Sequence, residues 1–131
     1  MKRERANNLN PDALAYMGDA VYESRIREML LLQGNTRADR LHRKATGSVC
    51  AQAQSEAIQT LYEELTEQEQ AQVRRWRNHK YHSKAKHADP MTYKWATAFE
   101  ALVGYLYLTG DLQRLDWLFR RTVEIIDTGV T

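Results

Sequence analysis

A chain of 131 residues is long enough to bury one hydrophobic core and short for two, so we expect residues 1–131 to form a single domain. With only 6 glycines and 2 prolines there are few places to turn, which favours an all-α fold over a strand-rich one. The net charge of +2 is too small to indicate a partner by itself.

The amino terminus, MKRERANNLN, contains no apolar stretch, and no apolar run in the chain reaches the ~18 residues that a membrane span needs. We therefore expect a cytoplasmic protein without membrane contact. Cys50 is the only cysteine, which excludes an intrachain disulfide. It lies on a helical pattern with no activating base in evidence, so we expect a buried and inert thiol.

Cap and turn residues predict a bundle of helices. Asn10 before Pro11 and Asp89 before Pro90 are cap-and-proline start signals, and TEQE from Thr66 forms a capping box. Residues 78–89 are polar and basic, and we expect a loop there. The predicted helices cover about residues 11–33, 36–46, 48–65, 66–77, 90–109 and 112–127.

Two segments each place an acidic side chain beside a glycine in an otherwise apolar helix. LAYMGDAVYE contains Gly18 and Asp19, and YKWATAFEALVGYLYL contains Glu100 and Gly104. Glycine inside a helix costs about 1 kcal/mol relative to alanine, so two such positions indicate two helices that pack closely. We expect the two carboxylates to meet there and to share a ligand.

A divalent cation is the ligand that this pair of acids favours, because a lone carboxylate is costly to bury. Mg²⁺ takes one or two carboxylates, keeps several waters and accepts phosphate oxygens. Asp19 and Glu100 are therefore the candidate metal ligands and catalytic residues, with water attacking a phosphate in line. The open alternative is that both acids are structural. We interpret Asp12 as an acid that favours the positive end of the helix dipole, and Glu23 as the i,i+4 ion-pair partner of Arg27.

The same segments resemble the motifs of the ribonuclease III family. LAYMGDAVYE resembles its Gly-Asp signature helix, and FEALVGYLYL resembles its second motif, E-A-L-[IV]-G. LHRKAT falls between them, where the family has a basic stretch ending in Ala-Thr. The chain leaves no room for the double-stranded-RNA-binding domain of ordinary ribonuclease III, and in this it resembles the shortened Mini-ribonuclease III branch.

This resemblance implies an all-α ribonuclease III-type endonuclease domain that binds Mg²⁺ through Asp19 and Glu100. It also implies a homodimer that cleaves double-stranded RNA into 5′-phosphate and 3′-hydroxyl ends, with 23S ribosomal RNA precursors as the substrate. Whether a ribosomal protein assists is left open. Two positions that are acidic in full-length relatives are Ala15 and Thr97 here, so water or substrate phosphate must complete the metal's coordination.

A basic segment at residues 74–87 carries six cations and no acid, whereas the rest of the chain is net acidic. Cations neutralise phosphates, and duplex RNA is recognised mainly through its shape, 2′-hydroxyls and phosphates. A solvated loop without a partner is the alternative, and the histidines at 79, 82 and 87 lack cysteine partners for zinc. The candidate RNA-binding residues are Arg74, Arg75, Arg77, Lys80, Lys84, Lys86, His42, Arg43 and Lys44.

The leading functional hypothesis is a Mg²⁺-dependent endoribonuclease that matures 23S ribosomal RNA precursors. The main alternative is a non-catalytic ribonuclease III fold that binds structured ribosomal RNA, which the missing acids at 15 and 97 favour. A helical protein-interaction domain is the third class.

Overall fold

The computed structural model describes residues 1–34, 37–38, 50–80 and 89–129. Within these ranges the chain is helical and contains no strand, which confirms the all-α fold class. Every helix in the described part is too short or too polar to span a lipid bilayer. The elements are α1 (Arg3–Asn7), α2 (Pro11–Leu32), α4 (Ala51–Leu61), the 3₁₀ turn η1 (Tyr62–Glu64), α5 (Glu67–Arg77), α6 (Pro90–Leu108) and α7 (Leu112–Gly129).

The helix-start signals lie at the positions that the sequence predicts. The Asn10 side chain accepts a hydrogen bond from the backbone N–H of Ala13 and caps α2. Thr66 and Glu69 form a reciprocal capping box at α5. The Asp89 carboxylate accepts from two backbone N–H groups in the first turn of α6. Local chemistry therefore determines where three of the helices begin.

Three expectations differ from the structure. The short helix α1 was not predicted, because Ala6 is its only buried residue and gives no apolar period. The helix expected at 48–65 is shorter, since α4 ends at Leu61 and continues as η1. Cys50 is exposed at the extended N-cap position of α4, so the expectation of a buried thiol is wrong. The helix expected at 36–46 falls almost entirely outside the described residues.

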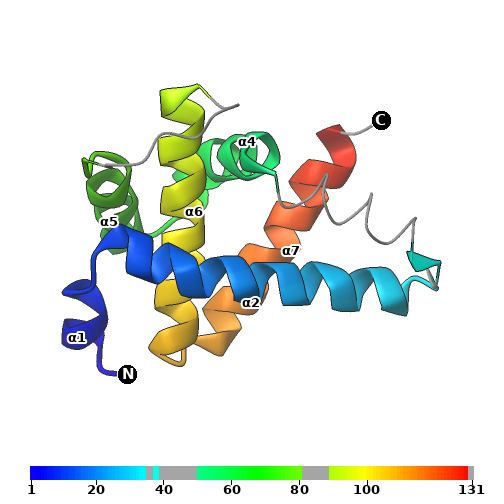
Figure 1. Cartoon of the computed structure of the whole chain (residues 1–131), viewed down its shortest axis with the longest axis horizontal. Helices are drawn as coiled ribbons and strands as arrows, with labels where there is room; N and C mark the ends of the chain where they lie inside the picture. The colour runs from blue at the N-terminus through cyan, green and yellow to red at the C-terminus, as the bar shows by residue number, and fades with distance from the viewer. Residues whose placement is uncertain (35–36, 39–49, 81–88, 130–131) are drawn as a thin grey trace.

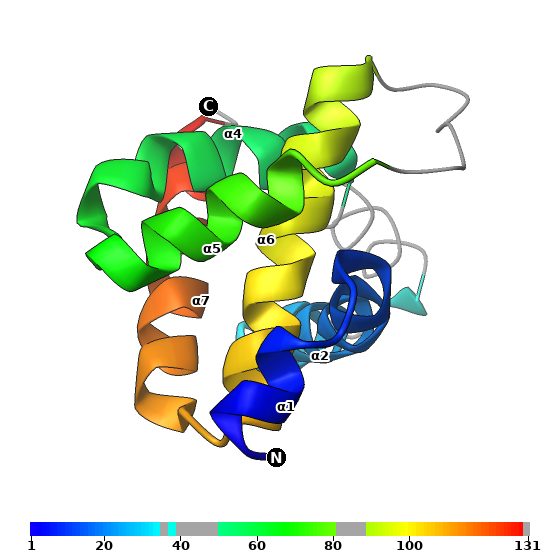
Figure 2. The same ribbon diagram turned by 90° about the vertical axis from the view of Figure 1, so that its left-hand side faces the viewer.

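Helix α6 is the centre of the fold. It crosses α2 on one side, and α4, α5 and α7 pack around its other sides (Figures 1 and 2). Its buried residues run almost without a break from Ala96 to Leu106, as expected for a helix covered on several faces. Tyr22 of α2 meets Phe99 of α6 edge-on, with ring centroids 5.1 Å apart.

The crossing of α2 and α6 is so close that their backbones touch. A Cβ atom added to Gly18 would lie 1.8 Å from the Glu100 carbonyl oxygen. One added to Gly104 would lie 2.0 Å from the Leu14 carbonyl oxygen. Neither position has room for any side chain, which explains why each helix accepts the intrinsic cost of an interior glycine.

Helix α7 is held against the rest by charged and aromatic contacts. Arg114 donates two hydrogen bonds, of 2.8 and 2.7 Å, to the buried carboxylate of Glu69 on α5. Its guanidinium also lies 3.7 Å from the centre of the Trp117 ring. Arg121 pairs with Glu64 of η1 at 2.8 Å. These contacts attach the last helix to the η1–α5 region.

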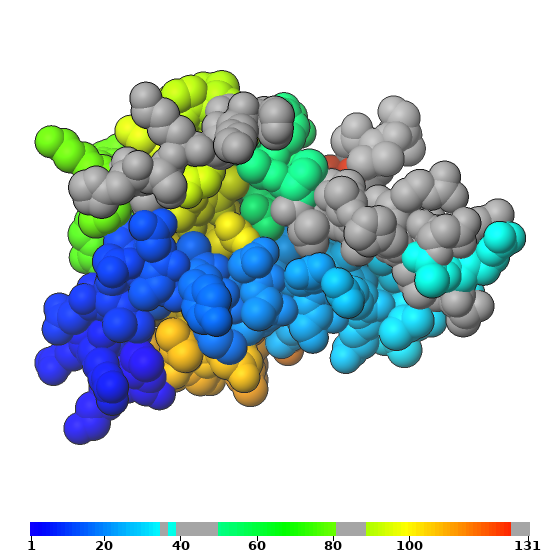
Figure 3. All heavy atoms as spheres, in the orientation of Figure 1, coloured from blue at the N-terminus to red at the C-terminus, as the bar shows by residue number. Residues whose placement is uncertain are grey.

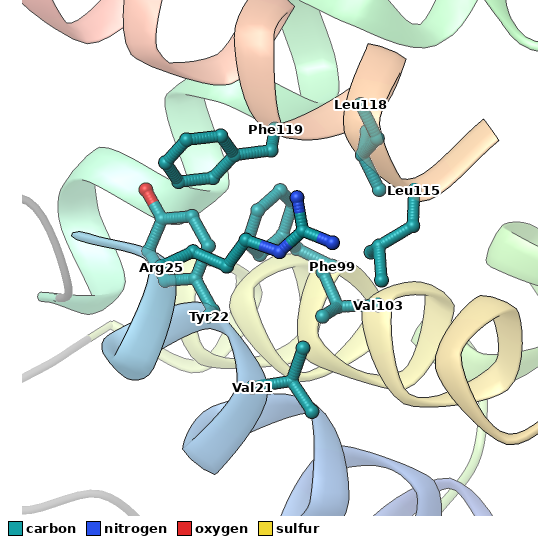
Figure 4. A pocket seen from close by; sticks show the side chains of 8 residues that line it. All are labelled: Val21, Tyr22, Arg25, Phe99, Val103, Leu115, Leu118 and Phe119. Carbon is teal, nitrogen blue, oxygen red and sulfur yellow. The ribbon is translucent and has the colours of Figure 1, made fainter. Parts of the chain in front are cut away.

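A small apolar pocket remains between α2, α6 and α7 (Figure 4). Its volume of about 10 Å³ is about what one water molecule needs and too little for a ligand. The Arg25 side chain borders it, with its guanidinium 5.8 Å from the Phe119 ring and paired with Asp116. We interpret it as a packing defect of the core.

Gly18→Ala is expected to destabilise the protein. At an open helical position this change would stabilise by about 1 kcal/mol, but here the methyl group meets backbone and overpacking costs roughly 3 kcal/mol. Urea unfolding measures the difference. Ala20→Gly, at an exposed site on the same helix, is the control and should cost about 1 kcal/mol. A Gly18→Ala protein as stable as the parent would contradict the backbone contact.

Candidate active site

An open hollow of about 380 Å³ lies where the first halves of α2, α4 and α6 meet. In Figure 3, α2 (blue to light blue) crosses the molecule, and parts of α6 and α4 are visible above it. The hollow is large enough for an ion with its waters and for part of a phosphodiester group. It is lined by Asp12, Ala15, Tyr16 and Asp19 of α2, Ala51 and Gln54 of α4, and Tyr93, Ala96, Thr97 and Glu100 of α6.

The structure brings the two predicted acids together. Asp19 follows Gly18 directly, and Glu100 is the residue whose carbonyl faces Gly18, so both belong to the close crossing. Both carboxyl groups line the hollow, close enough for Asp19 to act directly on the pKa of Glu100. Asp19 is exposed to solvent, whereas Glu100 is half-buried. Close backbone contact thus becomes close contact between two acidic side chains.

This contact strongly perturbs Glu100. Burial, and then the hydrogen bond and negative charge of Asp19, raise the pKa of Glu100 from 4.5 to about 9. The Gln54 amide acts weakly in the opposite direction. Without a bound cation, Glu100 therefore keeps its proton at neutral pH. An ion that binds both carboxylates must displace this proton.

The donor set fits a hard divalent cation. No ion pair formed within the described residues involves Asp19 or Glu100, so a positive charge would complement both. The described residues contain no cluster of three or more acidic, histidine or cysteine ligands. A Mg²⁺ ion bound by two carboxylates would keep most of its coordination positions for water and substrate oxygens, which is common for this ion.

Thr97 and Ala15, the two positions that are acidic in full-length relatives, fit their surroundings without a charged side chain. Thr97 is 5% exposed, and its hydroxyl donates a 2.9 Å hydrogen bond to the Tyr93 carbonyl on the same helix. Ala15 places only a methyl group in the hollow. Asp12 lies in the first turn of α2, as expected, but it also lines the hollow, which the sequence interpretation did not include. Its spacing of seven residues from Asp19 places it two turns earlier on the same side of the helix, which agrees with this position.

The arginines of the basic segment lie at the end of α5, and none of them lines the hollow. Arg74 and Arg75 are exposed, although Arg74 donates to the Tyr62 hydroxyl at 2.8 Å. Arg77 lies over the Trp95 ring, 4.8 Å from its centre. Lys80 is exposed beyond the helix end. Five candidates fall outside the described residues: Lys84, Lys86, His42, Arg43 and Lys44.

Sequence reasoning did not single out Gln54. This residue is 2% exposed and lines the hollow from α4. Its spacing from Ala57 and Ile58 places it on the buried face of α4, so a polar residue on an apolar stripe was the signal that could have found it.

Comparisons with known proteins show the family of this chain. The family model of the ribonuclease III domain matches residues 12–111. The chain is 49% identical over 121 residues to a Mini-ribonuclease 3 from Symbiobacterium thermophilum, covering 92% of this chain and 93% of that protein. A Mini-ribonuclease 3 from Streptococcus pneumoniae is 44% identical over 123 residues, covering 92% and 96%.

A crystal structure of a Fusobacterium nucleatum protein is similar in fold. It superposes with a TM-score of 0.80 at 27% identity, covering 95% of this chain and 98% of that one. The chain therefore belongs to the Mini-ribonuclease 3 branch of the ribonuclease III family. It is an endoribonuclease of the ribonuclease III type, a class that generally depends on a divalent metal.

Glu100→Gln is expected to stabilise the metal-free protein, and more so at high pH. Because the folded state raises the pKa of Glu100, its contribution to stability is full below pH 4.5 and is lost as the pH rises toward 9. Glutamine removes this loss. At about 1.4 kcal/mol per pKa unit before screening, we expect the gain to grow by roughly 2–4 kcal/mol between pH 5 and pH 9.

Urea unfolding in EDTA at several pH values measures this effect. Glu28→Gln, which removes an exposed carboxylate elsewhere on α2, controls for the change in net charge. Equal pH dependence in the parent and in Glu100→Gln would show that Glu100 does not hold its proton in the folded state.

Proposed function

We propose that this protein hydrolyses double-stranded RNA with Mg²⁺ bound between Asp19 and Glu100. The observation that carries the proposal is the meeting of these two carboxyl groups in a hollow that supplies no cation of its own among the described residues. Membership of the ribonuclease III family supports the reaction class.

Bound at this position, Mg²⁺ would add positive charge at the scissile phosphate and increase the acidity of an attacking water. Asp19 and Glu100 would hold the ion at a fixed distance from the helix crossing. In the hydrolysis, the water oxygen bonds to phosphorus and the bond from phosphorus to the 3′ oxygen breaks. The products are a 5′-phosphate and a 3′-hydroxyl, which takes up a proton.

The basic segment is proposed to contact the RNA beside the hollow. Helix α5 ends with three arginines beside the first half of α6, where Arg77 lies over the Trp95 ring (Figure 2). Exposed Arg74, Arg75 and Lys80 would meet phosphates of a duplex that extends past the hollow. Lys84, Lys86 and the patch His42–Lys44 belong to the same proposal on sequence alone.

A homodimer is proposed because of an exposed aromatic side chain at the rim of the hollow. Tyr16 is 83% exposed, more than any other large apolar side chain of the described residues. It lies on α2 one turn before Asp19. A second copy that covers Tyr16 would bring two hollows to one interface, where each could cut one strand of a duplex.

The branch resemblance further points to 23S ribosomal RNA precursors as the substrate, in the bacterial cytoplasm. A ribosomal protein is an additional partner that this substrate would bring with it. A precursor stem is therefore the first RNA to test.

Asp19→Asn is expected to abolish cleavage of duplex RNA, with a loss of at least about 100-fold, because one of the two direct ligands is gone. The RNA should still bind, since the phosphate-binding cations are unchanged. Cleavage is measured on a labelled 23S precursor stem with Mg²⁺ and with EDTA, and binding by retardation in a gel. Asp116→Asn, outside the hollow on α7, is the control and should cut like the parent.

Cleavage by Asp19→Asn at the parent rate would refute the metal assignment. Parent protein that retards duplex RNA in Mg²⁺ but leaves it intact would favour the non-catalytic RNA-binding module instead.

Tyr16→Asp is expected to give a monomer, because an exposed charge opposes burial of this surface in an apolar interface. Sedimentation velocity of parent and variant measures the mass directly. Leu112→Ser, at an exposed apolar residue of α7, is the control that should leave the assembly unchanged. A parent protein that sediments as a monomer, or a Tyr16→Asp protein that remains dimeric, would refute this interface.

A further inference from the structure

Gln54 carries a buried side-chain amide that has no evident role in packing α4. It is 2% exposed, and its side-chain nitrogen makes no hydrogen bond of good geometry within the described residues. Other glutamines of α4 are paired: Gln52 donates to Glu56 at 2.8 Å, and Gln59 donates to Ser55 at 3.0 Å. A buried unpaired donor is costly and therefore indicates a missing acceptor.

The position of Gln54 identifies which acceptor is missing. It reaches the hollow from α4, and its amide lies close enough to the Glu100 carboxyl to influence its pKa. The other buried donor in the lining, the Thr97 hydroxyl, is already bonded to the Tyr93 carbonyl. Gln54 is thus the unpaired buried donor that faces the two acids from the third helix.

A carboxylate that binds an ion with one oxygen needs a donor for its other oxygen. Such hydrogen bonds orient metal ligands, and their loss commonly weakens metal binding by roughly 10- to 100-fold. We propose that Gln54 is a positioning residue whose amide donates to the Glu100 carboxylate and holds it in the orientation that binds the divalent cation. This inference rests on the proposed function of Asp19 and Glu100.

The test uses Gln54→Met, which keeps the length of the side chain and removes its donor. Gln52→Met makes the same change at an exposed position two residues away on α4 and is the matched control. Mg²⁺ binding to each metal-free protein is measured by isothermal titration calorimetry, with Asp19→Asn as the variant that lacks a ligand. We expect roughly tenfold weaker Mg²⁺ binding for Gln54→Met and no change for Gln52→Met.

Stability and kinetics separate this role from a structural one. Because the side-chain nitrogen of Gln54 makes no hydrogen bond of good geometry, metal-free Gln54→Met should unfold at the parent's urea concentration or above it. Its kcat at low Mg²⁺ should fall while KM for RNA stays constant, and excess Mg²⁺ should restore kcat. If Gln54→Met unfolds early, Gln54→Leu serves as a second apolar variant.

Parent-like Mg²⁺ affinity in a folded Gln54→Met protein would overturn the inference, even if its affinity for RNA were reduced. If Asp19→Asn binds Mg²⁺ as tightly as the parent, the proposed metal site itself fails. The two failures are therefore distinguishable in one set of titrations.

Discussion

The contact between the backbones of α2 and α6 is the constraint on which the rest of this structure depends. Gly18 lies against the Glu100 carbonyl and Gly104 against the Leu14 carbonyl, at separations that exclude any Cβ atom. The same crossing carries Asp19 and Glu100 on its solvent-facing side. Packing and chemistry are thus coupled, because whatever keeps the helices together also sets the distance between the two carboxyl groups.

The site is an unfavourable arrangement that the fold imposes on its own side chains. Two acids are held together in a partly buried hollow, and the Glu100 carboxyl retains a proton as a result; the nitrogen of the neighbouring Gln54 amide makes no hydrogen bond of good geometry. The surrounding core, which includes Tyr22 and Phe99, supplies the stability that tolerates this arrangement. A ligand that satisfies all three groups at once gains binding energy from the release of this local cost.

Much of this fold could be predicted from local signals, because caps and interior glycines have direct physical causes. Asn10, Thr66 and Asp89 begin their helices as predicted, and the glycines at 18 and 104 indicated the crossing. Tertiary position was not accessible in this way. The exposure of Cys50, the place of Asp12 in the hollow and the isolation of Gln54 depend on how α4 and α2 approach α6.

Because the main chains of α2 and α6 are in contact at two points, sliding of one helix along the other is sterically opposed. The backbone positions of the two acids are therefore preorganised before any RNA binds. A mutation that loosened the contact between Gly18 and Gly104 would therefore be expected to disturb the spacing of the acids as well as the packing of the helices.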